Sequence, residues 1–262
     1  MSGNNGKGIV LQERDRHLLR ELALMRVVDR AQAQIVGPFG SVTRAKSRLL
    51  GLTRAGFLQR FFLGTEGGGK KAVYMLSPPG ARLVGARPTG VRRAREGTVV
   101  ADIFVAHQFL VNDLYCDFKY GTSVPQALRF SQWQSFSAPF DRSVPLIPDG
   151  YVEFEGTPNA LAAFIEVDRA HERLSVWREK VRHYLEYAVS GLFPRQFSQN
   201  RFLVLAVCET PGRVETIRAT TASLTDKIFR FTTFPLVRQH GMWSPIWLKP
   251  RGDEPESLVE IP

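Results

Sequence analysis

Hydrophobic and polar positions in the first 85 residues follow a helical period three times and then alternate as they do in strands. Asp29 and Ser41 stand where helix caps are expected, and Gly56 stands where the third helix should end. The helices are predicted at residues 11–25, 30–36 and 42–56, and the strands at residues 57–64 and 71–76. Three helices followed by a hairpin with a glycine-rich basic tip are typical of a winged helix-turn-helix domain.

The pattern of the second half predicts an α/β domain with a mixed sheet flanked by helices. Its helices are expected at residues 99–118, 172–190 and 215–226, and three of its strands at residues 128–136, 201–209 and 229–237. The apolar run 201–209 is typical of a central buried strand. Two further strands complete this sheet, one containing Asp149 and the next containing Glu166 and Asp168. The chain as a whole is therefore α+β. We expect a disordered N-terminus (1–10), a winged helix-turn-helix domain (11–85), a basic linker (86–98), the α/β domain (99–245) and a flexible tail (246–262).

Composition is that of a globular protein, with 44% hydrophobic and 23% charged residues. No apolar window is long enough for a transmembrane helix, and the N-terminus lacks the apolar core of a secretory signal. Cys116 and Cys208 stand in apolar settings without metal-ligand spacing, which favours free buried thiols. These features lead us to expect a cytoplasmic protein that does not associate with membranes.

Positive charge is concentrated at the start of the chain. Residues 1–98 contain 18 lysines and arginines against 6 acidic residues, whereas the remaining residues contain 17 against 19. A local surplus of this size favours a polyanionic partner such as double-stranded DNA, although solubility alone is a simpler explanation.

The third helix of a winged helix-turn-helix enters the major groove, so its exposed side chains are the expected readers of DNA. Arg44, Ser47 and Arg48 are predicted to face outward there, and Lys70 and Lys71 on the wing are predicted to contact phosphates. The full predicted DNA-binding set is Arg44, Lys46, Ser47, Arg48, Arg54, Lys70, Lys71, Arg92 and Arg93.

Three carboxylates form the second candidate site. Glu166 and Asp168 share one face of their strand, and Asp149 lies on the neighbouring strand. A carboxylate in the middle of an apolar strand requires a cation. One option is a divalent metal, Mg or Mn, bound by these three residues. The other is a protein cation, for which the candidates are Arg169, Arg173, Arg178 and Lys180.

This layout resembles the active sites of metal-dependent nucleases of the PD-(D/E)xK type. The resemblance breaks at Asp168, which stands where that pattern has a lysine. In some proteins of this type the lysine has moved to the following helix, which makes Lys180 the candidate catalytic lysine beside Asp149, Glu166 and Asp168. Its role would be to stabilise negative charge at the attacked phosphate. The simpler interpretation is a lysine that covers the helix edge. No phosphate-binding loop of P-loop spacing is present, so no nucleotide or organic cofactor is expected.

The chain as a whole resembles the replication-relaxation family of plasmid and mobile-element proteins. The resemblance depends most on IPDGYVEF, FIEVDRAHE and WREKVRHYLEY, and also on HQFLVNDLY and the predicted winged-helix segments. It implies a bacterial DNA-binding protein that acts in replication, relaxation or regulation of mobile elements.

Three hypotheses follow. The first is a DNA-binding protein in plasmid replication, relaxation or transcriptional control. The second is a metal-dependent nuclease or nickase that uses the carboxylate site, and the third is an assembly adaptor whose winged helix binds protein. A homodimer and contacts with other replication or mobilisation proteins are compatible with the first, because DNA readers often pair on two half-sites.

Overall fold

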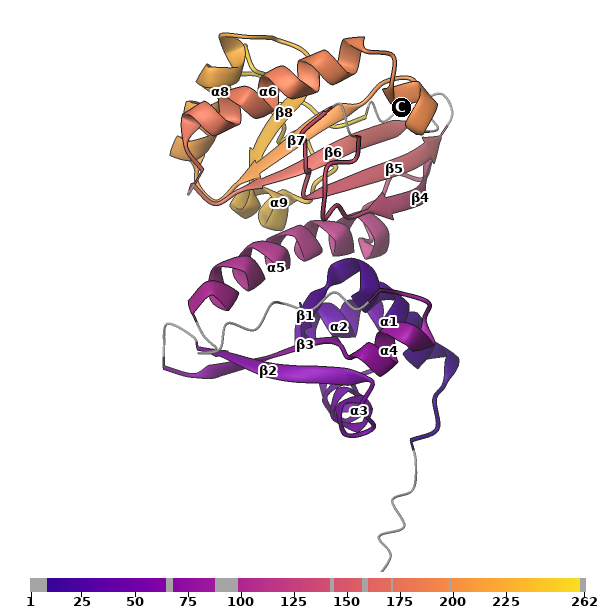
Figure 1. The fold of residues 1–262 in the computed structure, drawn as a ribbon. Helices are drawn as coiled ribbons and strands as arrows, with labels where there is room; N and C mark the ends of the chain where they lie inside the picture. The colour runs from indigo at the N-terminus through magenta and orange to yellow at the C-terminus, as the bar shows by residue number, and fades with distance from the viewer. Residues whose placement is uncertain are drawn as a thin grey trace, which may run out of the picture. The chain divides into compact units, whose positions relative to one another are not determined.

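A computed structural model describes residues 9–64, 68–87, 99–141, 144–156, 160–170, 172–197 and 199–259, with the side chains of residues 99–103 not described. The chain forms two compact units, an amino-terminal unit of residues 1–116 and a carboxy-terminal unit of residues 117–262 (Figure 1). The predicted mixed α and β composition is confirmed. None of the described helices has the length and apolar character needed to cross a membrane. Most of the expected disordered N-terminus and basic linker lies outside the described residues.

The division between the two units falls inside helix α5 (Val99–Tyr120), between Cys116 and Asp117. Residues 99–116 therefore belong to the amino-terminal unit, whereas we expected the second domain to begin at residue 99. Hydrogen bonds explain the difference. In the amino-terminal unit the Asn112 side chain donates to the Val27 carbonyl at 2.6 Å, and Gln32 donates to the Phe109 carbonyl at 2.9 Å.

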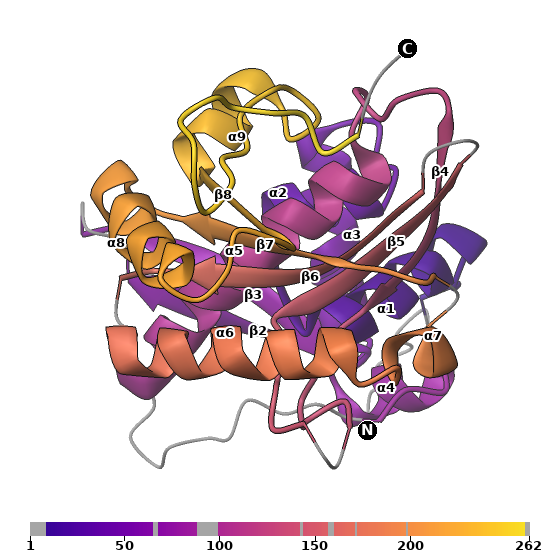
Figure 2. The same cartoon turned by 90° about the horizontal axis from the view of Figure 1, so that it is seen from above.

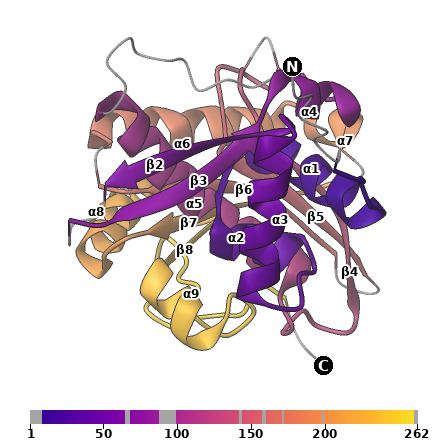
Figure 3. The ribbon, with the colours of Figure 1, turned by 90° about the horizontal axis from the view of Figure 1, so that it is seen from below.

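The amino-terminal unit contains the three predicted helices and the predicted hairpin. Before α5, its elements are α1 (Glu13–Met25), β1 (Val27–Asp29), α2 (Arg30–Val36), α3 (Val42–Arg54), β2 (Leu58–Gly64), β3 (Lys70–Leu76) and α4 (Pro78–Leu83). The strand β1 was not predicted, because three residues are too few to show a period. It pairs antiparallel with β3, which gives a sheet of order β1-β3-β2 (Figure 1). The two strands of the hairpin, β2 and β3, are seen side by side in Figure 3.

Local chemistry sets the starts of α2 and α3. The Asp29 side chain accepts a hydrogen bond from the Gln32 amide at 2.8 Å, and the Ser41 side chain accepts one from the Arg44 amide at 3.2 Å. Both caps satisfy amides that have no partner within the helix. On α3, Ala45, Leu49 and Leu52 are fully buried, so the opposite side of this helix is the exposed one.

The carboxy-terminal unit is built on a five-stranded mixed sheet of order β4-β5-β6-β7-β8 (Figure 2). The strands are β4 (Leu128–Gln134), β5 (Gly150–Gly156), β6 (Leu161–Asp168), β7 (Leu203–Cys208) and β8 (Phe229–Thr233). The first three pair antiparallel, whereas β6, β7 and β8 are parallel. The helices are α6 (Leu174–Val189), α7 (Phe193–Gln196), α8 (Pro211–Ala222) and α9 (Phe234–His240).

Helices α6 and α8 cover one face of this sheet (Figure 1). Trp177, Val181 and Tyr184 of α6 belong to the same buried cluster as Phe164 of β6 and Phe229 of β8. All eight residues of β6 are buried, which is expected of the central strand of a sheet that is covered on both faces. Burial of both faces of β6 places its acidic residues inside the unit.

Two predictions for the end of the chain are wrong. The segment 229–237 was expected to be one strand, but β8 ends at Thr233, whose side chain accepts a hydrogen bond from the Leu236 amide at 3.3 Å and caps α9. The expected flexible tail at 246–262 is ordered in its described part, residues 246–259. Phe231 and Leu248 exchange two backbone hydrogen bonds of 2.9 Å, and Trp247 is fully buried. Apolar residues of the tail therefore complete the core of this unit.

Candidate nucleic-acid interface and buried carboxylate site

The exposed side of α3 presents most of the predicted DNA-binding residues of this helix. Arg44, Lys46, Ser47 and Arg54 are exposed on α3, and Lys70 is exposed at the start of β3. The Ser41 cap and the buried Ala45, Leu49 and Leu52 hold the helix in place behind them. Arg92 and Arg93, which were also predicted to contact DNA, lie outside the described residues.

Arg48 differs from the prediction. Its Nε donates a hydrogen bond of 2.7 Å to Oδ1 of Asp15, and its Nη2 pairs with the other oxygen of the same carboxylate. Nη2 also donates to the Val10 carbonyl at 2.6 Å. Asp15 is completely buried in α1, so Arg48 compensates a charge that would otherwise lie in the core. Arg48 is therefore a structural link between α3 and α1 and is not available to read bases.

A basic groove of about 560 Å³ lies beside α3 and between the elements of the amino-terminal unit. Five cationic side chains line it, against the single carboxylate of Asp29. The cations are Arg30 of α2, Lys46 of α3, Arg60 of β2, and Lys70 and Lys71 of β3. The groove also contains Phe62, whose large side chain is 52% exposed, with the Arg60 guanidinium 5.0 Å from its ring centre.

Among the residues that the structure describes, Lys71 is the one groove cation with a close carboxylate. Its Nζ lies 2.5 Å from Oδ2 of Asp29 and 4.6 Å from the centre of the Phe109 ring. Asp29 thus caps α2 and neutralises one wing lysine at the same time. The charge that remains in the groove comes from Arg30, Lys46, Arg60 and Lys70.

Arg30 and Arg60 line the groove but were not among the residues predicted from the sequence. The signal for Arg60 was present in the alternation of β2, which places Arg60 and Phe62 on one face, opposite Tyr74 and Ala72 of β3. Arg30 gave no such signal, because its place beside the hairpin depends on how α2 packs.

In the carboxy-terminal unit, Glu166 is buried and has two close donors. Lys180 Nζ of α6 lies 2.9 Å from Oε2 of Glu166, and the Tyr184 hydroxyl donates to Oε1 at 2.6 Å. Lys180 Nζ also lies 2.9 Å from Oε1 of Glu172. Of the four protein cations that the sequence offered for Glu166, the structure selects Lys180. Tyr184 and Glu172 were not predicted as site residues, because only the position of α6 on the sheet brings them here.

Burial and neighbouring charges act on these groups in opposite senses. Burial raises the pKa of Glu166, and the nearby charge of Asp149 adds to this effect, while Lys180 lowers it. Burial by itself would lower the pKa of Lys180, but the carboxylates of Glu166 and Glu172 outweigh it and raise the pKa above its usual value. Burial also raises the pKa of Tyr184, which keeps its hydroxyl protonated as a donor. With 2.9 Å contacts on both sides of Lys180, we take the ionised pair as the native state.

Asp168 has a different partner from Glu166. Arg213 of α8 donates two hydrogen bonds to its two oxygens, at 2.9 and 2.7 Å, and a third to the Glu172 carbonyl at 2.7 Å. The Ala170 amide also donates to Asp168 at 2.6 Å. Arg213 was missed because α8 was expected to begin at residue 215. Thr210 followed by Pro211 is a helix-start signal that indicated the earlier start.

Asp149 lies just before β5, whereas the sequence predicts it inside the strand. Its Oδ2 accepts a hydrogen bond from the Val167 amide at 2.8 Å, and its own amide donates to the Ile165 carbonyl at 3.0 Å. The next residue, Gly150, packs so closely on Trp133 that an added Cβ would lie 2.5 Å from the indole ring. This close contact explains why residue 150 is a glycine, and the two hydrogen bonds hold Asp149 against β6.

The three carboxylates do not fit the predicted Mg or Mn site in this arrangement. A hard cation needs carboxylate oxygens that can turn toward it, whereas both oxygens of Glu166 and both oxygens of Asp168 accept from protein donors. Across the part of the chain that the structure describes, no three His, Cys, Asp or Glu side chains form a group able to hold a metal ion. The geometry favours the other option that the sequence left open, a network of protein ion pairs.

Comparison with known proteins gives one match. Residues 18–199 match the replication-relaxation family, a span that covers most of the amino-terminal unit and the carboxy-terminal unit as far as α7. No curated protein and no solved structure matches the chain.

Proposed function

Because the chain belongs to the replication-relaxation family, which supports a role in replication or relaxation of plasmids or mobile elements, we propose that its amino-terminal unit binds double-stranded DNA. In this proposal the unit is a winged helix-turn-helix, with α3 as the recognition helix and β2–β3 as the wing. The order α1-β1-α2-α3-β2-β3 and the antiparallel sheet support this interpretation.

The observation that carries the proposal is the basic groove next to α3. Within the described part of the chain, four of its five cations have no close carboxylate partner, which gives the groove an excess of positive charge. Lys46, Arg60 and Lys70 come from three different elements and line one groove, as contacts to successive phosphates require. Arg44 and Ser47, exposed on the same helix, are the proposed base-contacting residues.

Salt dependence of DNA binding tests this proposal. Binding of the full chain to a labelled duplex is measured by fluorescence anisotropy over a range of salt concentrations. Each phosphate contact that is lost should reduce the slope of log K against log salt by about 1. The triple variant Lys46→Ala, Arg60→Ala, Lys70→Ala should therefore lose about 3 from the slope, with a thermal melt like that of the wild type.

Arg82→Ala is the matched control, because Arg82 is exposed on α4 of the same unit and does not line the groove. It removes one positive charge and should leave the slope unchanged. A triple variant that keeps the wild-type slope would place the DNA-binding surface elsewhere. Absence of DNA binding by the wild type would favour the adaptor hypothesis instead.

In the same proposal, the carboxylates of Glu166 and Asp168 in the carboxy-terminal unit have a structural role and join the sheet to the helices that cover it. Glu166 is joined to α6 through Lys180 and Tyr184, and Asp168 is joined to α8 through Arg213. Metal-dependent DNA cleavage at this site stays a prediction from the sequence, as do dimerisation and contacts with other replication or mobilisation proteins. The position of Lys180 beside Glu166 was anticipated both by the nuclease hypothesis and by the ion-pair alternative.

A further inference from the structure

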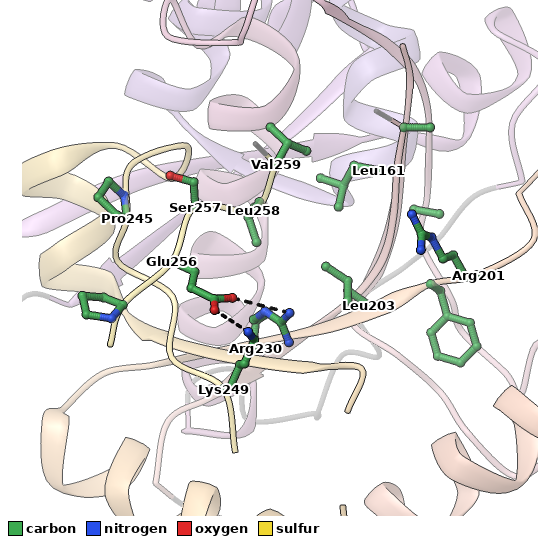
Figure 4. A pocket seen from close by; sticks show the side chains of 14 residues that line it. Leu161, Arg201, Leu203, Arg230, Pro245, Lys249, Glu256, Ser257, Leu258 and Val259 are labelled. Carbon is green, nitrogen blue, oxygen red and sulfur yellow. Dashed lines mark hydrogen bonds and ion pairs between the residues drawn. The ribbon is translucent and has the colours of Figure 1, made fainter. Parts of the chain in front are cut away.

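A cavity of about 950 Å³ opens in the carboxy-terminal unit at the amino ends of its three parallel strands (Figure 4). Leu161 begins β6 and Leu203 begins β7, and Arg230 is the second residue of β8. The register places these strand starts next to one another, since Ala163 pairs with Leu203 and Val204 pairs with Phe229. The cavity is thus at the opposite end of the strands from Asp168, the last residue of β6.

The chain after α9 forms the other wall of the cavity. Trp247 and Glu256 exchange backbone hydrogen bonds of 3.1 and 2.8 Å, and Leu248 bridges to Phe231 of β8. This fold-back carries Lys249 and Glu256 to the strand ends, and Leu258 and Val259 line the same space. The charged lining residues all follow residue 199, where the match to the family ends. The cavity is therefore a feature of this chain that the family match does not describe.

Positive charge exceeds negative charge in the lining. Arg201, Arg230 and Lys249 face a single carboxylate, that of Glu256. Lys249 forms an ion pair with Oε1 of Glu256, while Nη2 of Arg230 lies 3.8 Å from Oε2, beyond hydrogen-bond distance. Figure 4 shows the Glu256 carboxylate facing both of these side chains, and Arg201 on the other side of the cavity. The described lining thus has two more positive charges than carboxylates.

Arg230 is the best-positioned of these cations to receive a ligand. Its side chain is only 17% exposed, and its Nη1 donates to the Phe229 carbonyl at 2.9 Å. Burial lowers the pKa of Arg230, because the nearby Glu256 carboxylate does not fully offset the hydration that the guanidinium loses. An anion in the cavity would supply the missing compensation.

We propose that this cavity binds a small phosphate monoester with an apolar body. A monoester dianion carries a charge of about −1.5 to −2 at neutral pH, which matches the excess of two positive charges in the lining. The planar guanidinium of Arg230 suits a phosphate, and Lys249 and Arg201 lie on the rim of the same space. Leu161, Leu203, Leu258 and Val259 provide apolar surface for the rest of the ligand.

Calorimetric titration of the full-length protein tests the proposal with phenyl phosphate, adenosine 5′-monophosphate, inorganic phosphate and benzoate as probes. At least one of the two monoesters should bind saturably, about tenfold or more tightly than benzoate or inorganic phosphate. Preference for phenyl phosphate would indicate a general apolar body, and preference for the nucleotide would indicate a nucleoside.

Variants locate the binding. Arg230→Met should weaken the monoester by about tenfold or more, because it removes the buried cation and retains the side-chain length. Lys249→Met, on the more exposed rim, gives the same test if Arg230→Met does not fold. Arg178→Met removes a positive charge from the exposed side of α6, outside the cavity, and should bind as the wild type does. Absence of saturable monoester binding by the wild type would overturn the proposal, as would wild-type affinity in Lys249→Met and any folded Arg230→Met.

Discussion

Lys180 Nζ of α6 lies 2.9 Å from Oε2 of Glu166, a residue of the fully buried strand β6. The Tyr184 hydroxyl, one turn further along α6, donates to the other oxygen at 2.6 Å. Both oxygens of a carboxylate in the core are thus held by one helix. This relationship converts a buried charge into a link between the sheet and the helix that covers it.

Removal of Lys180 should destabilise the protein, because the Glu166 carboxylate would remain buried without its cation. Lys180→Met is expected to lower the free energy of unfolding by about 3 kcal/mol, the lower end of the range for a broken buried pair, since Lys180 is 28% exposed. Urea denaturation measures the change. The double variant Lys180→Met, Glu166→Gln should recover part of the loss, and strictly additive losses would contradict the pairing.

Asp15 should make stability depend on pH in the acidic range. Burial acts to raise the pKa of Asp15, but the hydrogen bonds from Arg48 and the Gln12 amide outweigh it and hold the pKa below its ordinary value. As pH falls, Asp15 is therefore protonated in the unfolded chain before it is protonated in the folded protein. Its contribution to the free energy of unfolding is present above the unfolded pKa of about 3.9 and is lost as pH falls through the folded pKa.

The measurement is urea denaturation of the wild type and of Asp15→Asn between neutral pH and about pH 3. The wild type should keep its advantage over the variant down to about pH 4 and begin to lose it below that pH. An advantage that is independent of pH would show that Asp15 does not titrate with folding.

Arg44 and Arg48 form a matched pair, four residues apart on α3 but with different surroundings. Arg44 is exposed, whereas Arg48 is bound to the buried Asp15. Arg44→Ala should weaken DNA binding and leave the melting temperature unchanged. Arg48→Ala should lower the free energy of unfolding by about 3 kcal/mol, because it leaves Asp15 uncompensated. Equal effects of both variants on DNA affinity, with neither affecting the melt, would contradict this assignment.

Supercoiled plasmid separates DNA binding from DNA cleavage. Incubated with the protein and Mg²⁺ or Mn²⁺, the plasmid should be retarded on a gel and remain supercoiled, because the oxygens of Glu166 and Asp168 are already engaged. The Asp149→Ala variant should retard it equally. Metal-dependent nicking by the wild type that disappears in Asp149→Ala and Glu166→Ala would instead support the nuclease hypothesis, and Lys180→Ala would be the next variant to assay.

The sequence by itself determined the elements that depend on neighbours close in the chain. Period and caps predicted α1, α2, α3 and the hairpin, because each helical turn and each cap joins residues three or four apart. It also showed that Glu166 must have a cation, because an unpaired carboxylate in an apolar strand is too costly to bury.

Only the tertiary structure decided which partners these residues have. Arg48 pairs with Asp15 at a separation of 33 residues, and Arg213 pairs with Asp168 at a separation of 45. Spacing carries no information about such pairs, since they form where packed helices and strands bring side chains together. The same reason explains the tail, which is polar and proline-containing in sequence but is held by Phe231 and the buried Trp247 in the folded unit.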